Sequence, residues 1–101
     1  MIKLNKIFTF LKENNILLEI KTRLLDVLEK HKDRIKDRLE PKIISYLNEG
    51  SEFAKEYIVS FIVDEIELPF PINLFKKTIK KTVEKNIDKL VSFLKSQIEK
   101  Y

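Results

Sequence analysis

The chain has 101 residues, 44% of them hydrophobic and 36% charged, with a formal net charge of +4 at pH 7. This length suits one domain around one hydrophobic core, so we expect residues 1–101 to fold as a single helical unit. One Gly and three Pro supply too few turns for a β-sandwich or a barrel, which favours an all-α fold. The lack of Cys and the single His exclude disulfides, thiolate metal sites and His clusters.

The N-terminal residues predict a short amphipathic helix, because Leu4, Ile7, Phe8 and Leu11 recur at helical spacing. Charged side chains interrupt this segment, so it lacks the apolar centre of a secretory signal. The longest apolar run, residues 57–63, is much shorter than the ~20 residues that cross a bilayer. We therefore expect a cytoplasmic protein.

A long second helix is predicted from about residue 16 to residue 39. Its apolar residues share one stripe: Leu17, Ile20, Leu24, Leu28, Ile35 and Leu39. His31 occupies the one position of this stripe that lacks an apolar residue. We expect it to be a buried structural histidine, with a general base or a pH switch as the alternative. Leu18 and Leu25 lie roughly 90° from the stripe, so this helix should also contact a second neighbour.

The next segment contains a proline and ends at the only glycine. Pro41 disfavours a helical conformation at Glu40, so residues 42–47 form either a new short helix or a kinked continuation. Gly50 is the natural end of the segment, because glycine readily takes the left-handed conformation that closes helices.

The most apolar helix is predicted at residues 52–66, with Ser51 as its N-cap. Its apolar side chains point in almost every direction, so we expect this helix in the middle of the bundle. Its β-branched residues also suit a strand, although the residues before them carry no turn signal. Residues 67–71 contain two prolines and must interrupt the chain.

From Asn73 onward, apolar residues step regularly by three or four: Phe75, Ile79, Val83, Ile87, Leu90, Leu94, Ile98 and Tyr101. This pattern predicts one long C-terminal amphipathic helix. Together the segments predict an all-α fold, a small bundle of four to five helices around a central apolar helix.

Positive charge is concentrated near the C-terminus, where residues 71–101 hold eight lysines against three acidic residues. Four of these lysines are spaced by four and form a candidate ridge for nucleic acid or another anion: Lys77, Lys81, Lys85 and Lys89. Neighbouring Glu84 and Asp88 neutralise part of the ridge, and a merely solvated helix face fits the same pattern. The acidic surplus of residues 43–67 suits docking against a basic helix, in the same chain or in a second copy.

Familiar catalytic motifs are absent. One Gly and one His cannot supply a phosphate-binding loop, a nucleophile elbow or a helical His–Glu motif. The carboxylates of Asp64, Glu65 and Glu67 lack the surrounding pattern of a calcium loop, so we expect no metal there. We expect a noncatalytic protein without a cofactor or a small-molecule substrate.

The leading functional interpretation is a helical protein-binding or regulatory protein, with an inhibitor-type protein and a homodimer as forms of it. A helix as apolar as residues 52–66 is difficult to cover in so small a domain, and an uncovered face becomes an interface. The aromatic residues expected to anchor it are Phe53, Tyr57, Phe61 and Phe70. The first alternative is a small basic nucleic-acid-binding protein that uses the lysine ridge. The second is a protein that binds an anionic membrane surface through the C-terminal helix.

Overall fold

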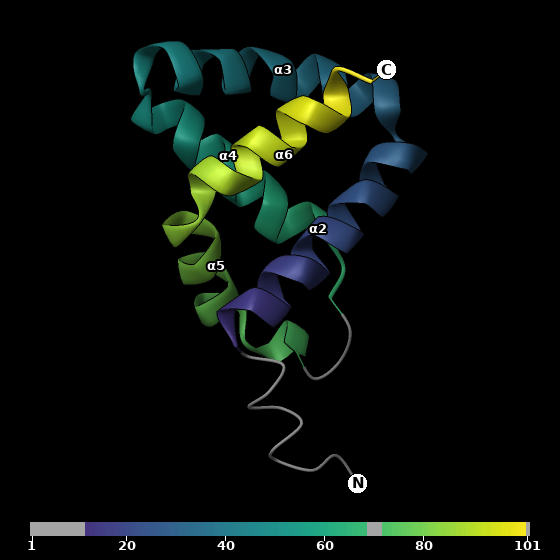
Figure 1. Ribbon diagram of the computed structural model, residues 1–101, viewed down its shortest axis with the longest axis vertical. Helices are drawn as coiled ribbons and strands as arrows, with labels where there is room; N and C mark the ends of the chain where they lie inside the picture. The colour runs from purple at the N-terminus through teal and green to yellow at the C-terminus, as the bar shows by residue number, and fades with distance from the viewer. Residues whose placement is uncertain (1–11, 69–71, 101) are drawn as a thin grey trace, which may run out of the picture.

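The computed structural model of the protein describes residues 12–68 and 72–100 (Figure 1). Within these ranges every regular element is helical, which confirms the all-α prediction. The α-helices are α2 (Glu13–Lys30), α3 (Lys32–Glu49), α4 (Glu52–Glu65), α5 (Lys76–Lys85) and α6 (Ile87–Ile98), and a short 3₁₀ helix, η1, covers Ile72–Leu74. The amphipathic helix predicted before residue 12 lies outside the described residues.

The single helix predicted from residue 16 to residue 39 is wrong, because α2 and α3 meet at His31 and run in different directions (Figure 1). His31 ends α2 by donating its N–H to the carbonyl of Val27 at 3.1 Å. Its own carbonyl accepts the N–H of Ile35 at 3.0 Å and so begins α3. The His31 side chain is exposed, which corrects the prediction of a buried structural histidine.

Helix α3 continues through Pro41, so the continuation is confirmed and the separate short helix is not formed. Proline has no N–H for the carbonyl of Asp37, and a proline inside a helix costs about 3 kcal/mol. Both Pro41 and Asp37 are exposed, so water reaches this turn. On the inner face Ile35, Leu39 and Ile43 are buried on both sides of the proline, and their burial holds the helix together.

The turn between α3 and α4 follows the two local signals in the sequence. Gly50 has a left-handed backbone, with φ at 63°, and donates its N–H to the carbonyl of Tyr46 at 2.9 Å. Ser51 caps α4, since its hydroxyl oxygen accepts the N–H of Ala54 at 3.2 Å. Both predictions are confirmed.

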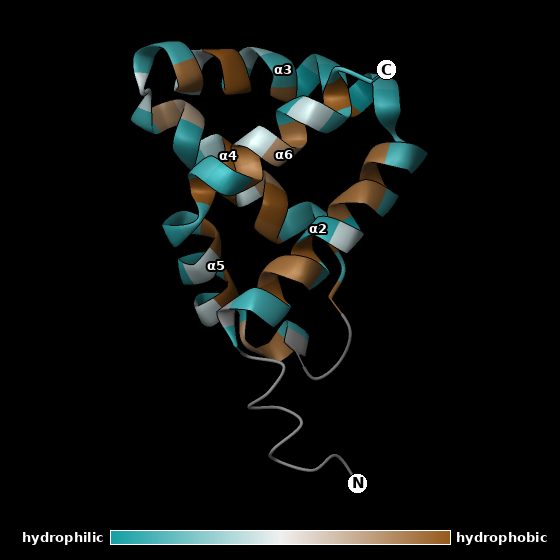
Figure 2. Ribbon diagram, in the orientation of Figure 1, coloured by the Kyte–Doolittle hydropathy of each residue, from teal (hydrophilic) through white to brown (hydrophobic). Residues whose placement is uncertain are grey.

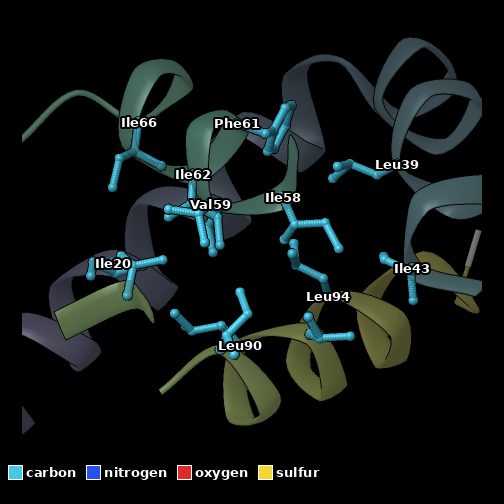
Figure 3. Packing of buried hydrophobic residues seen from close by; sticks show 14 of the residues in the cluster. Ile20, Leu39, Ile43, Ile58, Val59, Phe61, Ile62, Ile66, Leu90 and Leu94 are labelled. Carbon is cyan, nitrogen blue, oxygen red and sulfur yellow. The ribbon is translucent and has the colours of Figure 1, made fainter. Parts of the chain in front are cut away.

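Helix α4 occupies the centre of the bundle and packs against α2, α3, α5 and α6. Ile58, Val59 and Ile62 of α4 point toward Leu90 and Leu94 of α6 (Figure 3). These side chains are almost completely removed from water, so the apolar residues of α4 build the core. The helical interpretation of this segment and its central place are confirmed.

The single C-terminal helix predicted from Asn73 is also wrong, because α5 and α6 meet at Asn86 and point in different directions (Figure 1). The Asn86 N–H donates to the carbonyls of Thr82 and Val83, and its side-chain amide donates to the Thr82 carbonyl at 2.9 Å. Its carbonyl accepts the N–H of Leu90 and begins α6. Asn86 is buried, so this joint lies inside the fold.

Each α-helix contributes buried hydrophobic side chains to one core, and hydrophobic and hydrophilic residues alternate along the ribbons in Figure 2. Leu18 and Leu25 of α2 are exposed instead, and no described residue covers them as a second neighbour would. No helix within residues 12–68 or 72–100 is long and apolar enough to cross a membrane.

Candidate interaction surfaces

An open groove of about 490 Å³ lies between α3 and α6. It is lined by Glu40, Ile43, Ile44, Leu47 and Asn48 of α3, by Lys95 and Ile98 of α6, and by Glu99, which directly follows α6. Ile43 and Ile98 are buried, whereas Ile44 is 51% exposed and Leu47 is 46% exposed. The groove therefore combines an apolar base, two protruding aliphatic side chains and charges of both signs.

The sequence pattern does not predict this groove. The apolar stripe that it indicates in α3 runs through Ile35 and Leu39, which are buried in the core. Ile44 and Leu47 are three positions apart and lie on one side of the helix, so they signal a second apolar face. That Lys95 and Ile98 of α6 form the other wall follows only from the tertiary packing.

A hydrogen bond joins the two helices that form the groove. The hydroxyl of Tyr46 on α3 donates to Oδ1 of Asp88 on α6 at 2.6 Å, a length typical of a charged acceptor. This bond and partial burial, followed by the negative charges of Asp88 and Glu52, raise the pKa of Tyr46 from 10.0 to about 12. Tyr46 is therefore protonated and bonded at neutral pH.

Two of the predicted aromatic anchors share one surface. Phe53 is 69% exposed and Tyr57 is half-buried, and the ammonium of Lys42 lies over both rings, at 4.6 Å and 5.2 Å from their centroids. Phe61 instead packs in the core (Figure 3) and is not available at the surface. Phe70 lies outside the described residues.

The aromatic surface and the groove are separate. Lys42, which contacts the aromatic pair, and Ile44, which lines the groove, are two positions apart on α3. Residues at this spacing point about 200° apart around a helix. A partner seated in the groove therefore does not need Phe53 or Tyr57.

The break at Asn86 divides the predicted lysine ridge. Lys77, Lys81 and Lys85 lie exposed on α5, whereas Lys89 lies on α6, which runs in another direction. The spacing of four holds within α5 only, so the four lysines do not form one continuous ridge.

The helix of the acidic segment, α4, lies against the lysine-rich helix α5 of the same chain. Helix α4 packs on α5, and Glu52, Glu56 and Lys80 line a shared hollow of about 410 Å³. On the other side of α4, Glu65 pairs with Arg34 of α3 at 3.8 Å.

His31 and the acidic side chains of the described residues lie at or near the surface. None of their His, Asp and Glu side chains gather in a group of three that could hold a metal ion. His31 borders a hollow of about 260 Å³, together with acidic and basic side chains such as Asp26, Lys30 and Glu65. Every buried side-chain nitrogen or oxygen in the described part of the chain has a hydrogen-bond partner.

Comparison of the chain with protein-family models, with curated proteins and with solved structures gives no match. The surfaces are therefore interpreted from their own geometry and charge.

Proposed function

We propose that this chain is a noncatalytic helical protein that acts by binding another protein chain in the groove between α3 and α6. The observation that carries the proposal is the half-exposed pair Ile44 and Leu47 in a groove that apolar and charged side chains line together. Interfaces between proteins commonly have an apolar centre and a polar rim, and here Glu40, Lys95 and Glu99 supply the rim.

The groove is better suited to side chains of a protein than to a compact ligand. The groove is open to solvent, and Ile44 and Leu47 in its lining are about half exposed, whereas small-molecule sites usually bury most of the ligand surface. An incoming helix or hairpin would cover these side chains and fill the hollow together.

A photocrosslinking residue at position 47, in cells that produce the protein, tests the proposal directly. Leu25 is the matched control, because it is also a helical leucine and is 41% exposed against 46% for Leu47. We expect a discrete covalent protein adduct from position 47 and none from position 25. No adduct, or the same adducts from both positions, would contradict protein binding at the groove.

Nonspecific nucleic-acid binding is the second candidate function, and the exposed lysines of α5 favour it. Lys77, Lys81 and Lys85 repeat every four residues along one helix face, about 6 Å apart, near the phosphate spacing of an extended strand.

Fluorescence anisotropy with labelled single- and double-stranded nucleic acids at low and physiological salt tests this candidate. A variant with Gln at Lys77, Lys81 and Lys85 should bind more weakly and with a smaller salt slope. The control variant carries Gln at Lys30, Lys32 and Lys36, which changes the net charge equally on other helices. Equal losses in both variants would indicate a general charge effect and no site on α5.

A further inference from the structure

From the same groove we infer that its partner is a second copy of this chain, bound about a twofold axis. This inference rests on the proposed function and names the partner. A twofold interface uses the same surface on both copies, so that surface must be complementary to itself in shape and in charge.

The shape of the groove meets this requirement. Ile44 and Leu47 line the groove and are about half exposed, and the buried Ile43 and Ile98 line it with them. When two copies pair about an axis that passes through the groove, Ile44 and Leu47 of each copy face the groove of the other. Both sets of aliphatic side chains are then removed from water at once.

The charges around the groove also satisfy the requirement that the surface be complementary to itself. The rim holds Lys95 on one wall and Glu40 on the other, so a twofold axis midway between them brings Lys95 of each copy to Glu40 of the other. Within the described residues Lys95 forms a weak ion pair, to Glu99 at 3.9 Å, with both side chains more than half exposed. Glu40 forms no ion pair with another described residue. Both groups are therefore available to a second copy, whereas the lysines of α5 would repel their own copies.

The size of this face is also sufficient. A standard interface buries about 800 Å² on each partner, roughly an eighth of the 6845 Å² surface of this chain. The 18 residues of α3 extend about 27 Å, close to the side of a square patch of that area. The face formed by α3 and the end of α6 is therefore long enough for an interface of standard size.

Sedimentation equilibrium of the full chain, from low micromolar to millimolar concentration, tests the inference. We expect the wild type to reach twice the mass of the 12.1 kDa chain. Leu47→Asp should raise the dissociation constant at least roughly tenfold, since each dimer carries the change twice. The matched control Leu25→Asp should remain dimeric, and circular dichroism should show equal helicity for all three proteins. A wild type that stays monomeric, or two variants that dimerise equally, would overturn the inference.

A charge exchange provides a second test that a folding defect cannot imitate. Lys95→Glu places like charges against Glu40 of the second copy, and Glu40→Lys does the same with the opposite sign. Each variant alone should be monomeric, whereas an equal mixture should form the heterodimer, because unlike charges then meet at both contacts. A mixture that stays monomeric would overturn the proposed pairing.

The same experiments separate this inference from the proposed function. If the wild type is monomeric but position 47 crosslinks to a different protein, the groove binds a protein and the second copy is refuted. If the chain is monomeric and position 47 gives no adduct, both proposals fail.

Discussion

Replacing Tyr46 by Phe removes one hydroxyl group and the bond to Asp88 that joins α3 to α6. A hydrogen bond to a charged group stabilises a protein by about 1.5–3 kcal/mol when it is shielded from water. Because Asp88 is exposed, solvent screening weakens the stabilisation by this hydrogen bond. We therefore expect Tyr46→Phe to lower the free energy of unfolding by about 1 kcal/mol. In a domain of this size such a loss lowers Tm by roughly 4–8 °C.

The raised pKa makes this stabilisation depend on pH. The pKa of Tyr46 is about 12 in the folded chain and 10.0 without the surrounding structure, so folding favours the protonated hydroxyl. The contribution is complete below pH 10 and is lost as the pH rises through about 12. The difference in unfolding free energy between the wild type and Tyr46→Phe should therefore shrink over that interval.

The assay is urea unfolding of the wild type, Tyr46→Phe, Asp88→Ala and the double variant, which together give the coupling energy of the pair. Tyr57→Phe is the control, because it removes a tyrosine hydroxyl from another site and should change stability little. A coupling energy near zero at neutral pH, or one that stays constant up to pH 12, would refute the reasoning.

Three further predictions concern the fold and are read from the same unfolding experiment. Ile58→Ala in the centre of α4 should lower the free energy of unfolding by about 2–5 kcal/mol. Leu18→Ala on the exposed face of α2 should change it by no more than roughly 0.5 kcal/mol. Similar losses in both variants would contradict the assigned core. Ser51→Ala should remove about 1 kcal/mol by leaving the Ala54 N–H without its acceptor, and Ser60→Ala in the middle of α4 should not. Gly50→Ala should destabilise by roughly 1–2 kcal/mol through the left-handed backbone alone, since nothing lies within 4 Å of an added methyl group. An unchanged stability of this variant would mean that the turn adopts another conformation.

The all-α fold, the central helix and the turn at Gly50 and Ser51 were predictable because each depends on local chemistry. A buried helix must be apolar on most sides, a left-handed end favours glycine, and a helix start favours a serine hydroxyl. These requirements act within a few residues, so they are visible in the sequence.

The two joints were missed because the apolar spacing continues across them. Leu28 and Ile35 flank His31, and Val83 and Ile87 flank Asn86, and all four are buried in one core. Spacing records which side chains reach the core and does not record whether the helix axis turns between them. A signal was nevertheless present, since His31 and Asn86 are polar residues at the phase of an apolar stripe.

The groove could not be predicted because its walls come from segments about 50 positions apart in the chain. Local patterns give the exposed faces of α3 and α6 separately. Only the core packing of α3, α4 and α6 places Ile44 and Leu47 beside Lys95 and Ile98.

Each wall of the groove is a helix that begins immediately after a one-residue joint, α3 after His31 and α6 after Asn86. A joint of one residue leaves only two backbone torsions free to redirect the helix, and at Asn86 the hydrogen bonds to Thr82 hold that position. The bond from Tyr46 to Asp88 further restricts how far the walls can separate. We therefore expect the groove to keep its width when it is empty. Little conformational entropy is then lost on association, which strengthens binding without any added contact.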